Sequence, residues 1–233
     1  MKNPIIAVFL GIMSLFSGLF ITDEKSVIEI KEEVIEVINE PEVVSKKPEI
    51  SIPIELVRYC DSDRVTKKYD MFFKKYTKHE FGIEKDYRWF KSQGIAESAL
   101  NPNAKSPVGA QGIMQIMPRT MEEIKVKMGD NTLDVFKPSQ NIAAGIWYNK
   151  RLHSNWKSER PEDDRMALMF ASYNGGLGNP LKAQKICMTQ NNGVNCNLWH
   201  EIKYHAENVN TWKCEESLNY VTKIFKFMGI DGF

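Results

Sequence analysis

The chain reads GIAESALNPNAKSPVGAQGIMQIMPRT over residues 94–120, where a helical pattern gives way to a loop. The apolar spacing that leads into this stretch predicts a helix over residues 84–99. Residues 101–111 are rich in Asn, Pro, Gly and Ala, and this composition predicts a loop. The sequence therefore places Glu97 near the end of a helix, just before a glycine-rich loop.

Glu97 is the only carboxylate between Asp86 and Glu122. A carboxyl group near the end of an otherwise apolar helix is partly desolvated, and desolvation raises its pKa. Such a group keeps a proton near neutral pH and can donate it to a leaving oxygen. The alternative is an ordinary glutamate on a helix surface. Its position makes Glu97 the candidate catalytic acid.

Helical patterns continue through most of the chain, and strand-like alternation is nearly absent. Thr120 is typical of a helix N-cap, because Glu122 and Glu123 follow it in the first turn. Pro161 starts another predicted helix, which stops at Gly175. Further helices are predicted over residues 139–156, 181–188 and 215–228, and residues 109–115 leave room for a small hairpin. The expected fold class is mainly α.

Four short motifs follow one another along the body of the chain. They read ES at 97–98, GAQGIMQIMPRT at 109–120, ASYN at 171–174 and ESLNYV at 216–221. In this order they resemble the motifs of lytic transglycosylases of the soluble-transglycosylase (SLT) type, relatives of goose-type lysozyme. The resemblance covers residues 84–228. It implies a lysozyme-like helical domain that cleaves the glycan strands of peptidoglycan.

The resemblance assigns a role to each matching residue. Glu97 would act as general acid and then as base, and Ser98 would position either the substrate or Glu97. Tyr173 would orient Glu97 through its hydroxyl group. Tyr220 would close the site from the last helix.

Three further matching residues would line the groove and contact the sugar. Met114 offers a polarizable apolar surface, although plain core packing is the alternative for this side chain. Gln115 and Asn174 offer both a donor and an acceptor to the N-acetyl and hydroxyl groups of a sugar. Glu216 is expected to be structural.

The resemblance also implies a mechanism with one protein carboxylate. Most glycosidases use a carboxylate pair, and no obvious second acid lies in the motif segments. Glu97 would protonate the glycosidic oxygen while the N-acetyl group of MurNAc stabilises the developing cation. Glu97 would then take a proton from the 6-hydroxyl of the same sugar. The product would carry a 1,6-anhydro-MurNAc end, and neither a metal nor a cofactor is implied.

Two alternative functions remain open from the sequence. A hydrolytic lysozyme, such as a phage endolysin, needs a carboxylate to hold the attacking water. Asp130, Asp134 or Asp163 would have to supply that carboxylate. A non-catalytic cell-wall-binding protein would keep the fold without the reaction, but the intact Glu97 and Tyr173 argue against it.

The N-terminal residues 5–21 are almost wholly apolar. About 17 residues is the lower limit for a helix that spans a bilayer. We expect a membrane anchor over residues 1–22, with a cleaved signal segment as the alternative. Residues 23–55 would form an acidic, proline-interrupted linker, and residues 56–233 the catalytic domain. This organisation fits the inner membrane of a bacterium with the body facing the periplasm, and it also fits a phage lysis enzyme.

Charge is distributed unevenly along the chain. Residues 23–55 carry a net charge of −6, whereas residues 56–233 carry +6. A basic body suits an anionic polymer such as the cell wall or a nucleic acid. The sequence contains no clustered Lys/Arg stripe and no recognition motif for nucleic acid. We therefore expect a monomer whose partner is peptidoglycan.

The four cysteines indicate disulfides in an exported protein. A short loop separates Cys187 from Cys196, which makes this pair plausible and leaves Cys60 with Cys214. Four cysteines allow three pairings, so the other two stay open. A zinc site with His200 or His205 is a further alternative, but no CxxC or HExxH spacing supports it.

Overall fold

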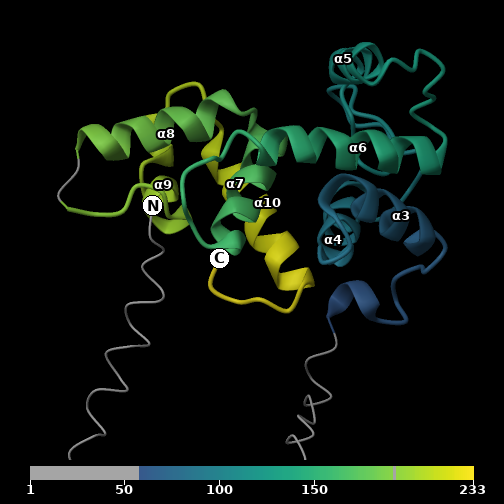
Figure 1. Ribbon diagram of the computed structural model, residues 1–233, viewed down its shortest axis with the longest axis horizontal. Helices are drawn as coiled ribbons and strands as arrows, with labels where there is room; N and C mark the ends of the chain where they lie inside the picture. The colour runs from purple at the N-terminus through teal and green to yellow at the C-terminus, as the bar shows by residue number, and fades with distance from the viewer. Residues whose placement is uncertain (1–57, 191–192) are drawn as a thin grey trace, which may run out of the picture. The chain divides into compact units, whose positions relative to one another are not determined.

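The computed structural model describes residues 58–190 and 193–233, and this part of the chain is mainly helical (Figure 1). The described residues form no named strand. The hairpin suggested over residues 109–115 is reduced to two isolated bridges, Lys105–Gln111 and Gln111–Ile116. The helices, in chain order, are η2 (Tyr59–Asp61), α3 (Asp70–Phe81), α4 (Arg88–Ser98), α5 (Pro118–Met128), α6 (Pro138–His153), α7 (Glu162–Gly175), α8 (Gly178–Thr189), α9 (Trp199–Tyr204), η3 (Ala206–Asn208) and α10 (Cys214–Phe227).

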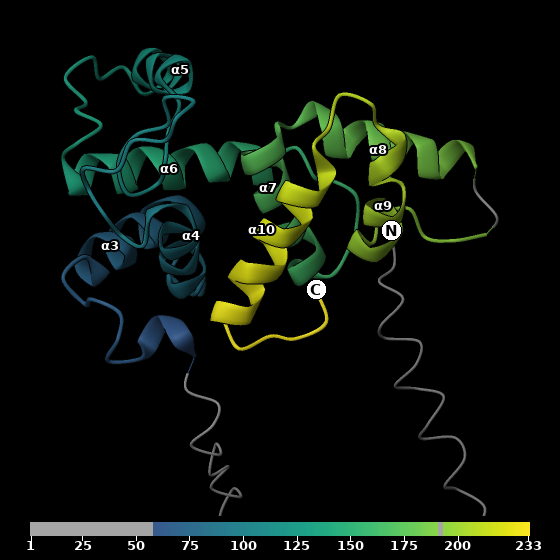
Figure 2. The ribbon, with the colours of Figure 1, turned by 180° about the vertical axis from the view of Figure 1, so that it is seen from behind.

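Helix α6 runs through the middle of the helical body and packs against both α3 and α7. Figures 1 and 2 show α3, α4 and α5 gathered at one end of α6, whereas α8 and α9 lie beyond α7. Helix α10 contacts α7 and also α4, so it joins the two groups. Trp89 of α4 meets Phe225 of α10 at 4.8 Å between ring centroids. These contacts place α4, whose last turn carries Glu97, against α10.

The helix ends follow local chemistry that the sequence pattern predicted only in part. Helix α4 begins four residues later than predicted, because an oxygen of Asp86 accepts a hydrogen bond from the Arg88 backbone amide at 3.0 Å. Helix α5 begins at Pro118, so the predicted N-cap at Thr120 is wrong. The fixed φ of proline and its missing amide hydrogen suit the first position of a helix. Helix α8 likewise begins at Gly178, three residues before the predicted start.

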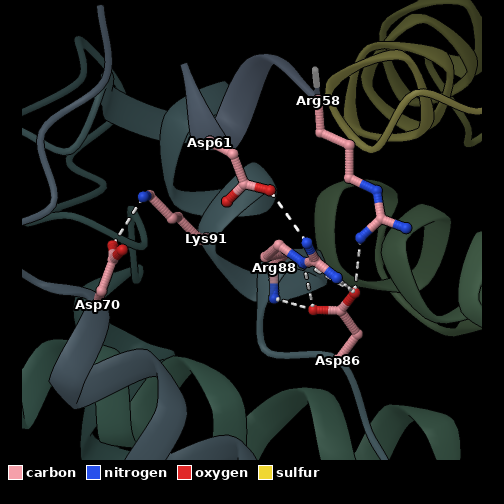
Figure 3. A network of polar contacts seen from close by, with 6 residues as sticks. All are labelled: Arg58, Asp61, Asp70, Asp86, Arg88 and Lys91. Atoms are coloured by element: carbon pink, nitrogen blue, oxygen red, sulfur yellow. Dashed lines mark hydrogen bonds and ion pairs between the residues drawn. The ribbon is translucent and has the colours of Figure 1, made fainter. Parts of the chain in front are cut away.

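A charged network fastens η2 to the start of α4 (Figure 3). Arg88 lies between two carboxylates, with contacts of 3.0 Å to Asp61 and 2.7 Å to Asp86. Arg58 reaches the same Asp86 at 3.0 Å. A guanidinium group presents several donors in a fixed fork, which suits this bridging position. The network therefore holds η2 against the start of α4.

The disulfide Cys187–Cys196 is present, as predicted, with 5.7 Å between the Cα atoms. The predicted pair Cys60–Cys214 is wrong, because both thiols are free. Cys60 lies in η2, next to Tyr59, whose ring stacks on Phe227 at the far end of α10. Cys214 begins that helix, and 13 residues of α helix span about 20 Å. The helix thus keeps the two cysteines apart.

No helix among residues 58–190 and 193–233 is long and apolar enough to cross a membrane. The predicted anchor over residues 1–22 and the predicted linker over residues 23–55 lie outside the described residues.

Candidate active site

Glu97 lies in the last turn of α4 and is half-buried. The Tyr220 hydroxyl, from α10, donates a hydrogen bond of 2.5 Å to its Oε1. Desolvation raises the pKa of Glu97 to about 7, although the Tyr220 hydrogen bond and the Lys223 charge oppose the rise and the Glu216 charge adds to it. A carboxyl group in this state is partly protonated near neutral pH, as a general acid must be. The predicted partial desolvation of Glu97 is present in the structure.

The backbone turns sharply just after Glu97. Ala99 and Leu100 both have positive φ, at 51° and 62°, which ends the helix in the left-handed region. The Ser98 hydroxyl donates to the Ile113 carbonyl at 2.8 Å and accepts from the Asn101 amide at 3.1 Å. Ser98 therefore ties the end of α4 to the glycine-rich loop. The predicted role of Ser98, to position either the substrate or Glu97, stays a prediction.

Met114 is fully buried, so the prediction that its side chain lines a groove is wrong. The reason is a notch in α6: a Cβ atom added at Gly145 would come within 2.8 Å of the Met114 side chain. The Met114 backbone is also held, because its amide donates to Asn141 Oδ1 at 2.7 Å. Met114 thus anchors the loop on α6 through its buried side chain and its backbone amide.

Gln115 adopts a left-handed backbone conformation, with φ of 46°. Its side-chain Nε2 donates to the carbonyl of Gly112 at 2.8 Å and to that of Ala104 at 3.3 Å. Both NH₂ hydrogens thus hold the loop, and only the amide oxygen is left for a ligand. The predicted contact between Gln115 and the sugar stays a prediction, and in this conformation Gln115 would make it as a hydrogen-bond acceptor.

Two tyrosines lie at the site, and their roles differ from those predicted. Tyr173 was expected to orient Glu97, but its hydroxyl donates to the Met114 carbonyl at 2.8 Å. Tyr220 contacts Glu97 instead. Burial first, and the charge of Glu97 second, raise the pKa of both tyrosines well above the ordinary value. Both phenols are therefore neutral hydrogen-bond donors.

Asn174 borders a cavity of about 250 Å³ at the end of α7. Its Oδ1 accepts a hydrogen bond of 2.6 Å from Ser217, whose oxygen accepts one of 2.9 Å from the Trp212 indole. A side chain at Gly175 would collide with this pair, since an added Cβ would lie 2.7 Å from the Ser217 oxygen. The cavity is lined by Asn174, Gly175, Asn179, Thr211, Trp212, Lys213, Glu216 and Ser217.

None of the contacts described for the three acids considered for a hydrolytic role is with Glu97. Asp130 accepts hydrogen bonds from Thr132, and Asp134 accepts one from the Phe136 amide. Asp163 lies in the first turn of α7, about 15 Å along the helix from Tyr173. Glu216 is the carboxylate whose charge acts on Glu97.

Residues 87–194 match the family model of the Transglycosylase SLT domain. These residues form an SLT domain. Glu97, Met114 and Tyr173 lie inside the SLT domain, whereas Tyr220 lies beyond its matched range. The fold agrees: the 70 kDa soluble lytic transglycosylase SLT70 from Escherichia coli superposes with a TM-score of 0.53 at 23% identity, over 71% of this chain and 24% of that one. An inactive mutant of the lytic transglycosylase Slt from Pseudomonas aeruginosa gives 0.54 at 22% identity, again over 71% and 24%.

Curated lytic transglycosylases are also similar to this chain. The membrane-bound lytic murein transglycosylase F of Shewanella pealeana is 35% identical over 141 residues, or 60% of this chain and 27% of the relative. The protein of the same name from Photobacterium profundum is 29% identical over 171 residues, or 69% of this chain and 31% of the relative. The chain thus spans less than a third of the length of these two relatives.

Two charged residues act on Glu97, of which Lys223 was not identified from the sequence and Glu216 was expected to be structural. Lys223 and Glu216 both act on the Glu97 carboxyl. They stand three and four residues from Tyr220, and this spacing places all three on one face of α10. Because the sequence motif already identified Tyr220, this helical spacing was the signal that could have placed Lys223 and Glu216 near the site. Among the described residues, no group of three or more His, Cys, Asp or Glu side chains is arranged to hold a metal.

Proposed function

We propose that this chain is a lytic transglycosylase that cleaves the β-1,4 bond between MurNAc and GlcNAc in peptidoglycan. One observation carries the proposal: a half-buried glutamate with a pKa of about 7, held by a tyrosine, at the edge of the SLT domain. The names of the matched relatives support it, because they are lytic murein transglycosylases.

In the proposed mechanism, protonated Glu97 donates its proton to the glycosidic oxygen. The Tyr220 hydroxyl contacts Oε1 alone, which leaves Oε2 as the atom that transfers the proton. The N-acetyl oxygen of MurNAc stabilises the developing cation, in place of a second protein carboxylate. Glu97, now ionised, takes the proton from the 6-hydroxyl, which attacks the anomeric carbon and closes the 1,6-anhydro ring.

The surrounding residues of the SLT domain would hold the sugar and the acid in place. The amide oxygen of Gln115 would accept from a sugar hydroxyl, and Asn174 would contact the sugar at the neighbouring cavity. Tyr173 would act indirectly, because its hydroxyl holds the loop at Met114. Positioning of this kind lowers the barrier by keeping the reacting groups close and aligned.

Membrane association is also part of the proposal. The matched relatives are named membrane-bound, and the apolar residues 5–21 would supply an anchor that leaves the SLT domain in the periplasm. Fractionation tests this part: recovery of the intact chain in the soluble periplasmic fraction would contradict it.

Mass spectrometry of the released muropeptides tests the reaction. Purified peptidoglycan digested with the full chain is expected to yield 1,6-anhydro-MurNAc ends, each one water lighter than a reducing end. Reducing ends would instead identify a hydrolase. An absence of new ends would identify a non-catalytic wall-binding protein.

The Tyr220→Phe variant is expected to shift the pH dependence of cleavage. The hydrogen bond from Tyr220 lowers the pKa of Glu97, so its loss raises that pKa further. The acid then stays protonated to higher pH, and the alkaline limb of kcat/KM moves up by about one pH unit. We also expect kcat to fall about tenfold as Glu97 loses a positioning contact.

Tyr204→Phe provides the matched control, because the Tyr204 side chain is 78% exposed. Its pH profile should overlay that of the parent chain. An unshifted alkaline limb in Tyr220→Phe would show that Glu97 is not the group whose protonation limits the reaction.

A further inference from the structure

A second cavity, of about 420 Å³, lies between α8 and the segment that follows η3. Helix α8 contributes one wall and residues 208–211 contribute the other. The two walls also contact each other, because α8 packs against η3. The lining residues are Lys182, Lys185, Ile186, Thr189, Asn208, Val209, Asn210 and Thr211.

The chemistry of this second cavity is cationic above an apolar floor. Lys182 and Lys185 are exposed and stand one turn apart on α8. Neither lysine forms an ion pair with a carboxylate of residues 58–190 or 193–233, and no acid lines the cavity. Ile186 and Val209 supply aliphatic surface between them. Such a lining suits a ligand that carries carboxylates on a short aliphatic backbone.

The second cavity shares a lining residue with the first cavity, which Asn174 borders. Thr211 lines both of them. Its hydroxyl accepts from the Lys182 ammonium at 3.1 Å and donates to Asn179 Oδ1 at 2.8 Å. Glu216, whose charge acts on Glu97, lines the first cavity. A ligand that lies in the first cavity at Asn174 therefore meets Thr211 and, beyond it, Lys182 of the second cavity.

The walls of the second cavity are fixed by covalent and polar contacts. The Cys187–Cys196 disulfide holds the last turns of α8 against the segment that follows it. Gln184, one turn before Cys187, donates to the Cys196 carbonyl at 3.0 Å. A wall fixed in this way lowers the ordering cost of binding, because the backbone that carries Lys182 and Lys185 is already held in place.

We propose that the second cavity binds the peptide stem of peptidoglycan, with Lys182 and Lys185 on its carboxylates. The inference rests on the proposed function. The glycan itself offers these lysines no anion, because the lactyl carboxylate of MurNAc is consumed in the amide bond to the peptide. The peptide stem carries free carboxylates on a short, largely aliphatic chain. Its carboxylates and aliphatic groups match the two ammonium groups and the apolar floor.

Binding of defined glycan fragments to the full chain carrying Glu97→Gln tests this inference. The fragments are GlcNAc–MurNAc oligomers with the peptide stem, the same oligomers stripped of peptide with the freed lactyl carboxylates converted to amides, and oligomers whose stem carboxylates are amidated. We expect the peptide-bearing fragments to bind about fivefold more tightly than either other set. The added variant Lys182→Gln/Lys185→Gln should remove this difference.

The double variant Lys68→Gln/Lys157→Gln is the matched control, since it removes the same charge from exposed positions outside the second cavity. It should keep the fivefold preference. Equal affinity for all three sets of fragments, or a preference that survives the loss of Lys182 and Lys185, would overturn the inference. Because this experiment measures binding, its outcome does not depend on whether the chain cleaves the glycan. A failure of the inference can therefore be distinguished from a failure of the proposed function.

Discussion

Glu97→Gln is expected to reduce the cleavage of purified peptidoglycan by about 10³-fold or more, the range expected for removal of a general acid–base. Glutamine keeps the shape of glutamate and can still accept from Tyr220, but it has no proton to donate and cannot take one back. Both proposed steps depend on this single carboxyl group. The measurement is the rate of release of soluble muropeptides at pH 6, below the Glu97 pKa of about 7.

The same substitution should also change how stability depends on pH. The pKa of Glu97 is raised from 4.5 to about 7 in the folded chain, so its ionisation opposes folding. In the parent, this cost is absent below pH 4.5, grows between pH 4.5 and 7, and is complete above pH 7. The Gln variant lacks this term, worth roughly 1–3 kcal/mol. Urea denaturation should therefore show its relative stability rising from pH 4.5 to pH 8.

Glu122→Gln is the matched control for Glu97→Gln. The Glu122 side chain is 69% exposed and contacts only Lys125 among the ion pairs of the described residues. Its activity should stay within twofold of the parent, and its stability should change little with pH. If Glu97→Gln kept a tenth of the parent activity, the single-carboxylate mechanism would be wrong.

The helical fold and the main acid could be predicted because both leave a local signal. Helical periodicity in α4, α6, α7 and α10 reflects one buried face per helix, and the spacing of apolar residues in the sequence reveals that face. Glu97 stands out because acids are missing around it. The Cys187–Cys196 disulfide is also a local feature, since the two cysteines are only nine residues apart.

The contacts that were predicted wrongly depend on how distant elements pack. Tyr173 and Tyr220 both come from motifs, and only the approach of α10 to the end of α4 decides which hydroxyl contacts Glu97. Burial of Met114 depends on a notch at Gly145, a position 31 residues later whose neighbours the sequence does not reveal. Cys60 and Cys214 are separated by the length of α10. Such outcomes are set by tertiary geometry, which residue type and spacing do not specify.

Asp70→Ala is expected to lower the free energy of unfolding by about 3–5 kcal/mol. Lys91 is completely buried in α4, and its ammonium lies 2.7 Å from the Asp70 carboxylate of α3 (Figure 3). This is the only ion pair of Lys91 among the described residues. Removing Asp70 leaves a buried charge without compensation. Urea denaturation at pH 7 measures the loss.

Two further variants separate this buried charge from simple loss of a contact. Asp63→Ala removes the partner of Lys67 in a pair whose side chains are 64% and 101% exposed, and it should cost less than about 1 kcal/mol. Asp70→Ala/Lys91→Met removes both buried charges and should recover most of the stability, because the apolar side chain fills the space without a desolvation cost. A loss that stayed the same in the double variant would mean that α3 and α4 are joined by packing, and that the ion pair contributes little.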